Sequence, residues 1–150
     1  DPERFAVQIG SGIGGMLTIE NELAKLFEKG PGRVSPFLVP MIITNIAGGN
    51  VAIRFNAKGI CTTVVTACAT GTNAIGDAYR LLKHGEADAV IAGSSEAPIT
   101  PLAVSGFTNM TALSTKNDIS RSSIPFDKER DGFVIGEGAG VLVMETLTNA

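Results

Sequence analysis

The sequence predicts an α/β fold in which short apolar strands alternate with amphipathic helices. Four runs have the composition of strands, at 5–9, 60–67, 87–92 and 141–144. Between them, apolar residues recur at helical spacing after the first run and again from Thr70 to Lys83. Strands and helices that alternate in this way form βαβ units and layers of helices and strands.

The first half of the chain predicts three helices and two strands. Leu17, Leu23, Leu26 and Phe27 share one face of a helix that follows a glycine-rich turn and ends at Gly30. Pro40 is suited to the first turn of a second helix, which we expect over 41–53. The β-branched residues of 60–67 predict a strand that leads directly into the helix from Thr70.

The second half predicts a buried strand at 87–92, a short helix at 101–107 and a last strand at 141–144. Between that helix and that strand, residues 109–131 are polar and irregular. Gly136, Gly138 and Gly140 precede the last strand rather than a helix, so we expect close backbone packing there and not a phosphate site.

Composition excludes several classes of protein. The net charge of −3 and the pI near 5.1 leave no basic excess for nucleic-acid binding. Two cysteines and a single histidine suit neither a disulfide scaffold nor a metal site. No apolar run approaches the ~18 residues of a membrane span, and Asp1–Arg4 does not resemble a secretory signal. We therefore expect a cytoplasmic protein of 150 residues with one core.

Cys68 is the candidate nucleophile, because it stands where a strand meets a helix. A helix N-terminus favours a thiolate, and its free N–H groups can hold a developing oxyanion. The small residues Ala69 and Gly71 would let a substrate approach the sulfur. The alternative is that Cys68 is only a small buried apolar residue, which is common for a free cysteine.

Other candidates have simpler interpretations. Cys61 is expected in the core of its strand, and His84 at the end of the Cys68 helix, about 24 Å away along that helix. Asp127–Asp131 is either a solvated charge run or an ion-pair network that fixes Phe133. Gly10-x-Gly12-x-x-Gly15 formally matches a dinucleotide fingerprint, but the second strand that should end in an acidic residue about 20 residues later is missing.

An ordered set of motifs along the whole chain resembles the β-ketoacyl-acyl-carrier-protein synthases of type II fatty-acid elongation. The nucleophile segment is 64–74, preceded by the glycine-rich segment 9–15. After it come the segments 92–96, 106–107, 112–114, 125–134 and 136–140. A single Thr-Ala-Cys would be a weak signal, whereas the set in this order is specific.

The resemblance implies a thiolase-like fold, in which two similar βαβ halves form five layers, α-β-α-β-α. Residues 1–150 would then be an incomplete portion of a ketoacyl synthase domain, mostly its N-terminal half. Family members are homodimers whose partner is acyl carrier protein, and we expect no cofactor. The Thr-rich run at 60–66 resembles the family strand that pairs across the dimer axis.

The resemblance also assigns roles to individual residues. Cys68 would accept the acyl group, with its own backbone N–H as half of the oxyanion hole. Ile13 and Phe107 match positions that line the acyl-chain pocket, and Phe133 matches an aromatic residue beside the sulfur. Arg33 stands where the family has a basic residue near the carrier entrance. The family's two catalytic histidines and its lysine correspond to positions beyond residue 150, so this chain alone is expected to be inactive.

Two related catalytic functions and one non-catalytic binding function are the alternatives. A polyketide ketosynthase usually has Ser directly after the nucleophile, where this chain has Ala69-Thr70-Gly71. A thiolase acts on coenzyme A esters and has a different cysteine segment. The non-catalytic chain-length partners of some synthases lack the cysteine that is present here.

Overall fold

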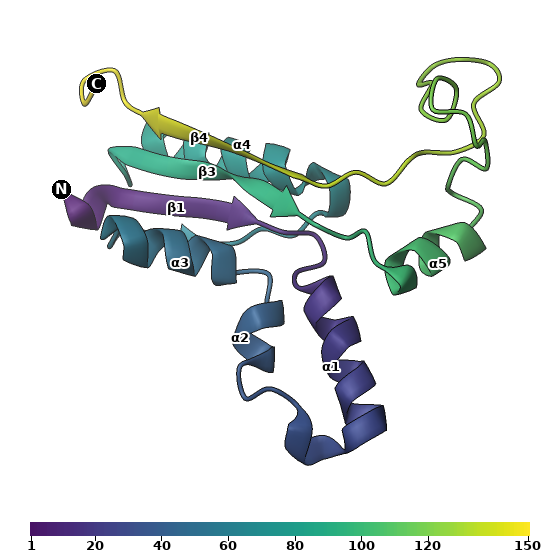
Figure 1. Ribbon diagram of the computed structural model, residues 1–150. Coiled ribbons are helices and arrows are strands. Elements are labelled where there is room, and N and C mark those ends of the chain that lie inside the picture. The colour runs from purple at the N-terminus through teal and green to yellow at the C-terminus, as the bar shows by residue number, and fades with distance from the viewer.

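The computed structural model describes residues 1–150 and contains one four-stranded sheet (Figure 1). Its strands are β1 (Phe5–Gly10), β2 (Cys61–Thr62), β3 (Ala89–Glu96) and β4 (Gly138–Glu145), in the order β2-β1-β3-β4. β1 is parallel to β2 and β3, whereas β4 is antiparallel to β3. The sheet and its helices confirm the predicted α/β class.

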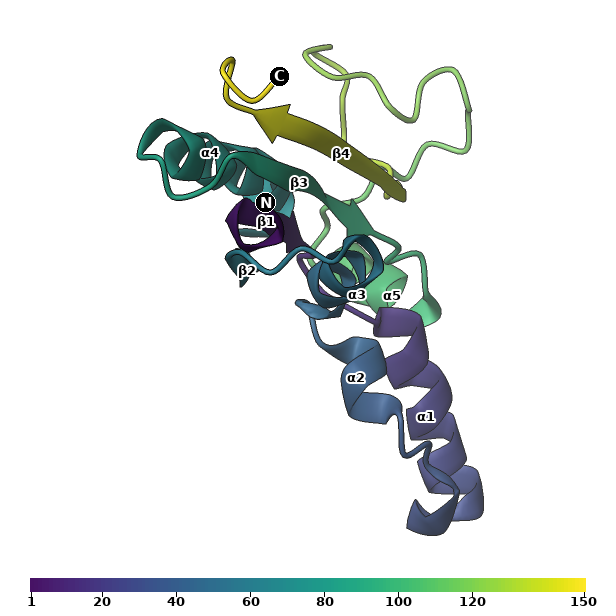
Figure 2. The same cartoon turned by 90° about the vertical axis from the view of Figure 1, so that its left-hand side faces the viewer.

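Helices cover both faces of the sheet, as Figures 1 and 2 show for α3 (Ile46–Phe55) and α4 (Thr70–Lys83). Alternate residues of β1 point to opposite faces. Ala6 packs in a cluster with Ala78 of α4, and Val7 packs in a second cluster near Val51 of α3. The core is therefore split into two thin layers, one on each side of the sheet.

Two helices form an arm that projects away from the sheet: α1 (Met16–Lys29) and α2 (Leu38–Ile42) (Figure 1). Gly30 ends α1 with a φ of 81°, a value that glycine adopts easily. The buried Glu22 carboxylate accepts hydrogen bonds from Lys25 Nζ and from the Ser35 N–H, which ties the two sides of the arm together. The hydrogen bond from Lys25, followed by that from Ser35, lowers the pKa of Glu22.

The remaining elements lie beyond the carboxyl end of β3. Helix α5 (Pro101–Asn109) begins at Thr100, whose hydroxyl accepts a hydrogen bond from the Ala103 N–H. An irregular segment from 110 to 137 then leads back to β4 (Figure 1). None of the helices combines the length and apolar character that crossing a membrane requires.

The prediction of a single helix over 41–53 is wrong, because the chain forms α2 and α3 with a break at Ile43. Ile43 is extended, with φ −67° and ψ 138°. The Gly15 N–H donates to Ile42 O, at 3.2 Å, and a side chain on Gly14 or Gly15 would collide with that end of α2. The glycine-rich turn thus packs against the end of α2 and occupies the carbonyl that a longer helix would use.

The predicted strand over 60–67 is also wrong in length, since only Cys61 and Thr62 pair with β1. The Thr63 hydroxyl donates to Ile9 O at 2.7 Å, and the chain then leaves the sheet. Strand β2 is an edge strand, so Cys61 is exposed and does not lie in the core as predicted.

The close packing expected at Gly136, Gly138 and Gly140 is found only at the backbone of Gly140, and none of the three positions itself requires a glycine. A Cβ placed on any of the three would meet no other atom within 4 Å. Gly138 and Gly140 are part of β4 itself. The close approach occurs instead at Gly93 of β3, where a side chain would collide with Gly140 O.

Candidate active site

Cys68 lies in a single 3-10 turn, Ala67–Ala69, that runs directly into α4. The segment between β2 and this turn has no regular secondary structure and is partly exposed, so a short irregular link replaces the strand expected before Cys68. Ala67 has a φ of 50°, which is unusual for a residue with a Cβ. Cys68 itself is exposed.

Two glycines let the turn approach the sheet closely. A Cβ on Gly10, at the end of β1, would collide with Thr70 and would lie 2.6 Å from Val64 O. A Cβ on Gly71 would lie 2.6 Å from the Ser94 hydroxyl of β3. The first turn of α4 is therefore seated against the carboxyl ends of β1 and β3, where ligands bind in many α/β sheets.

A mostly apolar pocket of about 450 Å³ opens beside Cys68. It brings together four of the residues predicted from the sequence, Ile13, Cys68, Phe107 and Phe133. They come from the glycine-rich turn, the nucleophile turn, α5 and the segment before β4. Other apolar lining residues are Ala67, Pro98, Val134 and Ile135. An alkyl chain is the kind of ligand that such a lining favours.

Phe107 and Phe133 form one wall of the pocket. Their ring centroids are 5.4 Å apart and the rings are nearly perpendicular, at 80°. Phe133 is held by its backbone: its N–H donates to Ala112 O, and its carbonyl accepts from the Ser114 N–H, each at 3.0 Å. The aromatic wall therefore depends on pairing between residues 112–114 and Phe133.

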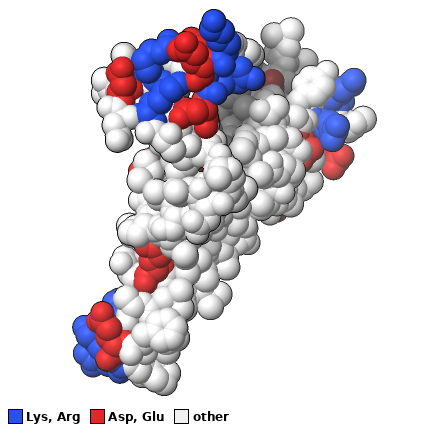
Figure 3. All heavy atoms as spheres, turned by 90° about the vertical axis from the view of Figure 1, so that its right-hand side faces the viewer, with Lys and Arg blue, Asp and Glu red and all other residues white.

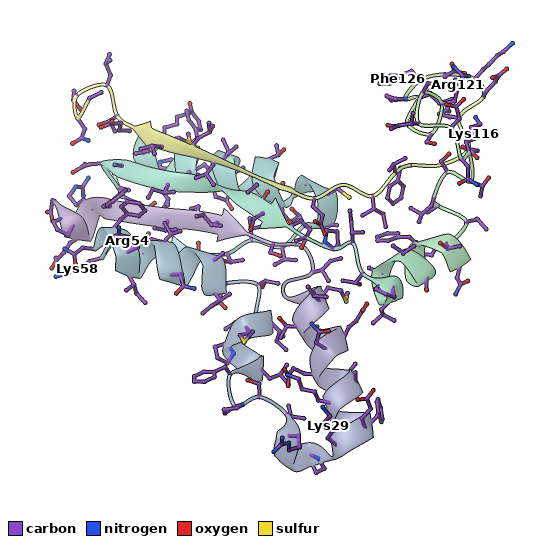
Figure 4. All side chains as sticks on the ribbon, in the orientation of Figure 1. Lys29, Arg54, Lys58, Lys116, Arg121 and Phe126 are labelled. Atoms are coloured by element: carbon purple, nitrogen blue, oxygen red, sulfur yellow. The ribbon has the colours of Figure 1, made fainter.

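Charged side chains next to Phe133 form the predicted ion-pair network, although it is partly exposed. Arg121 pairs with Asp127 at 3.2 Å and with Glu129 at 2.9 Å. The Asp131 carboxylate accepts hydrogen bonds from the hydroxyl and the backbone N–H of Thr115 and from the Ser114 hydroxyl, the last at 2.7 Å. The hydrogen bond from Ser114 is the main cause of the lowered pKa of Asp131. These ion pairs join the first part of the loop, which carries Lys116 and Arg121, to the part just before Phe133 (Figure 4).

Glu96, at the end of β3, holds the glycine-rich turn in place, a role that the sequence pattern does not indicate. Its carboxylate accepts hydrogen bonds from the N–H groups of Gly12 and Ile13, at 2.6 and 3.1 Å, and from the Ser11 hydroxyl, at 3.0 Å. The N–H groups that would bind a dinucleotide phosphate thus bind a carboxylate of the chain itself. This geometry disfavours the nucleotide interpretation of Gly10-x-Gly12-x-x-Gly15.

Arg33 is not part of the pocket. It lies just beyond α1, a helix of 14 residues that is about 21 Å long, so the arm separates it from the glycine-rich turn. Lys25, Lys29 and Arg33 border one surface hollow at the end of the arm. Figure 3 shows charged side chains gathered at the end of the arm and over the 110–137 loop, with few between these two places. Lys29 is labelled at the end of the arm in Figure 4.

Cys61 and His84 lie away from the pocket. His84 is the C-terminal cap of α4, at the opposite end of the helix from Cys68, as predicted. Partial burial of the Cys61 thiol raises its pKa, although the residue as a whole is exposed. No three His, Cys, Asp or Glu side chains converge on a position that could hold a metal ion. Of the two cysteines, only Cys68 borders the apolar pocket.

Comparison with known proteins finds close relatives of this chain. It is 55% identical over 148 residues to a 3-oxoacyl-[acyl-carrier-protein] synthase 2 of Staphylococcus aureus, and 52% identical over 149 residues to a protein with the same name from Synechocystis. Both matches include 99% of this chain but only 37% and 36% of the relatives' length. The chain thus spans just over a third of these proteins.

Solved structures agree with this result. One chain of a solved complex, described as a type II PKS acyl-carrier protein with its ketosynthase, matches with a TM-score of 0.95 at 31% identity. The match covers 99% of this chain and 38% of the chain in the complex. A β-ketoacyl synthase from Burkholderia phymatum matches with a TM-score of 0.83 at 34% identity, over 97% and 36%. The expected thiolase-like fold is therefore confirmed for the portion present here.

The family assignment rests on the full length of the chain. The family described as "Beta-ketoacyl synthase, N-terminal domain" matches residues 1–150, the range that also contains the nucleophile turn and the apolar pocket. The chain belongs to the β-ketoacyl synthase family, as a stretch of its N-terminal domain.

Proposed function

We propose that the protein containing this chain is a 3-oxoacyl-[acyl-carrier-protein] synthase of fatty-acid elongation, and that Cys68 is its acyl-accepting nucleophile. The observation that carries the proposal is the position of Cys68, on a sharp turn at a helix N-terminus and beside an apolar pocket. In this proposal residues 1–150 form part of one ketoacyl synthase domain.

In the first step, the Cys68 thiolate sulfur forms a bond to the carbonyl carbon of an acyl thioester. The bond from that carbon to the carrier's sulfur breaks, and the carrier leaves as a thiol after taking up a proton. The turn's own hydrogen bonds use the N–H groups of Thr66, Ala69 and Thr70. The Cys68 N–H is thus available to stabilise the oxyanion that develops on the carbonyl oxygen.

Ile13, Phe107 and Phe133 would then contact the acyl chain. Each is uncharged and lines the pocket that Cys68 borders. Burial of the chain contributes about 0.8 kcal/mol for each CH₂ group removed from water.

In the second step, a malonyl thioester loses carbon dioxide and its α-carbon attacks the acyl carbon. That carbon's bond to Cys68 breaks, which releases the thiolate and a 3-oxoacyl carrier. The groups that would stabilise the decarboxylation are the two histidines and the lysine of the family, at positions beyond residue 150. We therefore expect residues 1–150 alone to give no 3-oxoacyl product.

We further propose acyl carrier protein as the partner, a homodimer as the assembly and the cytoplasm as the location. A related solved structure is a complex of a ketosynthase with an acyl-carrier protein. Arg33, which the resemblance assigns to the carrier entrance, borders the same surface hollow as Lys25 and Lys29, so this end of the arm is the proposed docking place. The exposed edge strand β2 supports pairing with a second copy. A nucleophilic thiol favours a reducing compartment.

The proposal is tested with the purified full-length protein and an acyl carrier protein that carries an acyl group. Intact-mass measurement should show one acyl group added to the wild type and to Cys61→Ala, and none added to Cys68→Ala. Addition of malonyl carrier should then release a 3-oxoacyl product. Acylation of Cys68→Ala, or a wild type that is acylated but never condenses, would overturn the assignment.

A polyketide ketosynthase is the second candidate, because the solved structure with a TM-score of 0.95 comes from a type II PKS. The number of condensations separates the two functions. Without a reductase, the elongation synthase should stop after one malonyl unit, whereas a polyketide enzyme would extend the unreduced product repeatedly. Products with several malonyl units would favour the polyketide function.

A further inference from the structure

We propose that Thr70 is a positioning residue, whose hydroxyl fixes the nucleophile turn so that the Cys68 sulfur faces the apolar pocket. This inference rests on the proposed role of Cys68. Thr70 is the first residue of α4, and it is almost completely buried, with 3% of its surface exposed. A polar side chain so deeply buried at this point needs partners, and it has two.

The Thr70 hydroxyl connects the residues on either side of the turn. It accepts a hydrogen bond from the Thr66 N–H at 2.9 Å and donates one to Ala67 O at 2.8 Å. The Thr70 N–H donates to the same carbonyl. Thr66 and Ala67 directly precede Cys68, so this one side chain sets the direction in which the chain enters the nucleophile.

The conformation of Ala67 explains why such a connection is needed. A φ of 50° at a residue with a Cβ is disfavoured, and it persists only where surrounding contacts impose it. The two hydrogen bonds to Ala67 O supply that constraint. Without the hydroxyl, one of these two bonds and the bond from the Thr66 N–H are lost, and the remaining Thr70 N–H holds Ala67 less firmly at a positive φ. A rotation at Ala67 would move the sulfur of the next residue out of the pocket.

The methyl group of Thr70 has a separate role. It lies against Gly10 at the end of β1, where no side chain would fit. Valine would keep this packing and remove only the hydroxyl, whereas serine would keep the hydroxyl and remove only the methyl. At position 70, Thr and Val differ in the hydroxyl with the methyl kept, and Ser and Ala differ in the hydroxyl with the methyl absent. The two pairs of proteins therefore give two separate measurements of what the hydroxyl contributes.

The experiment uses the full-length protein and measures the rate at which iodoacetamide alkylates Cys68, by peptide mass spectrometry from pH 6 to 9. Cys61 in the same molecule serves as the internal reference, because it lies outside the pocket and away from the turn. Thr70→Val loses about one net hydrogen bond, so iodoacetamide should alkylate Cys68 about five- to tenfold more slowly in this variant. Thr70→Ser should react within about twofold of wild type, since one methyl group affects packing and not the turn.

The same comparison is repeated for acylation by the acyl carrier. Thr70→Val should lower the acylation rate by the same factor with little change in the concentration that gives half-maximal rate, because Val has nearly the shape of Thr and the apolar lining residues are unchanged. If Thr70→Val does not fold, as judged by its Cys61 rate and thermal midpoint, the Ser and Ala variants provide the same test.

Cys68 rates that are equal in the Thr and Val proteins, or equal in the Ser and Ala proteins, would overturn the proposal. A Cys61 rate that changes in parallel with the Cys68 rate between the Ser and Ala proteins would also overturn it, because it would indicate general loosening of the fold. Alkylation needs no acyl substrate, so failure of this inference is distinguishable from failure of the proposed function, in which the wild type would be alkylated at Cys68 but never acylated.

Discussion

Replacement of Ile13 by Phe should shorten the longest acyl chain that the full-length protein accepts. Phe has about three more side-chain heavy atoms than Ile, so it should displace about three carbons of a chain that fills the 450 Å³ pocket. At about 0.8 kcal/mol for each CH₂ group, that displacement costs about 2.4 kcal/mol, or about 60-fold in kcat/KM for the longest primers. Primers too short to reach Ile13 should be nearly unaffected.

The assay compares kcat/KM over a series of saturated acyl carriers for the wild type, Ile13→Phe and Ile13→Leu. The Leu variant is the matched control, because it has the same number of atoms as Ile. Overpacking can also destabilise a protein, typically by about 1–3 kcal/mol. A uniform loss for all chain lengths would therefore mean a folding defect, and an unchanged profile would mean that Ile13 does not line the acyl site.

Three further predictions follow from the site. In the full-length protein, iodoacetamide should label Cys68 faster than Cys61, because partial burial raises the pKa of Cys61 and keeps it protonated near neutral pH; equal rates would contradict the nucleophile assignment. Hydrogen bonds lower the pKa of Asp131 in the folded protein below its ordinary value of 3.8, so its stabilising contribution should be complete above that value and lost as the pH falls through the lowered pKa. The stability difference between wild type and Asp131→Asn, measured by thermal unfolding, should accordingly vanish in strong acid, and a difference that persists there would refute this. Glu96→Ala should reduce kcat/KM for long acyl chains more than for short ones, because it frees the Gly12–Ile13 segment; Glu96→Gln, which keeps one acceptor oxygen, should lose less, and an equal loss in both variants would argue for a role of the charge itself.

The sequence was informative where local pattern and tertiary contacts agree. The helix from Thr70 to Lys83 was predicted to the residue, because its apolar face packs on the sheet as its spacing indicates. Prediction from the sequence failed where a tertiary contact overrides the local conformational preference. The glycine-rich turn interrupts the helix predicted over 41–53, and the hydroxyl of Thr63 takes a carbonyl of β1 where more of β2 was expected.

The pocket residues show the same division. Resemblance to the family indicated Ile13, Phe107 and Phe133, and the fold brings all three beside Cys68. Thr70 and Glu96 received no role, because their importance lies in hydrogen bonds whose partners depend on the backbone path. Glu96 is more than 80 residues from the turn that it holds, at a separation of 84 from Gly12, and no short-range pattern predicts that contact.

The carboxylate of Glu96 within the glycine-rich turn has a consequence for reading such motifs in other chains. A strand followed by G-x-G-x-x-G and a helix creates converging N–H donors whatever the protein does, and those donors require an anion. The anion can be a diffusible phosphate or a side chain supplied by another strand of the same sheet. The G-x-G-x-x-G pattern alone therefore predicts that the turn binds a negatively charged group, but it does not identify that group. Where an acidic side chain accepts hydrogen bonds from the turn's own N–H groups, as Glu96 of β3 does here, those groups already have their anion and the turn is left to line a site for a different ligand.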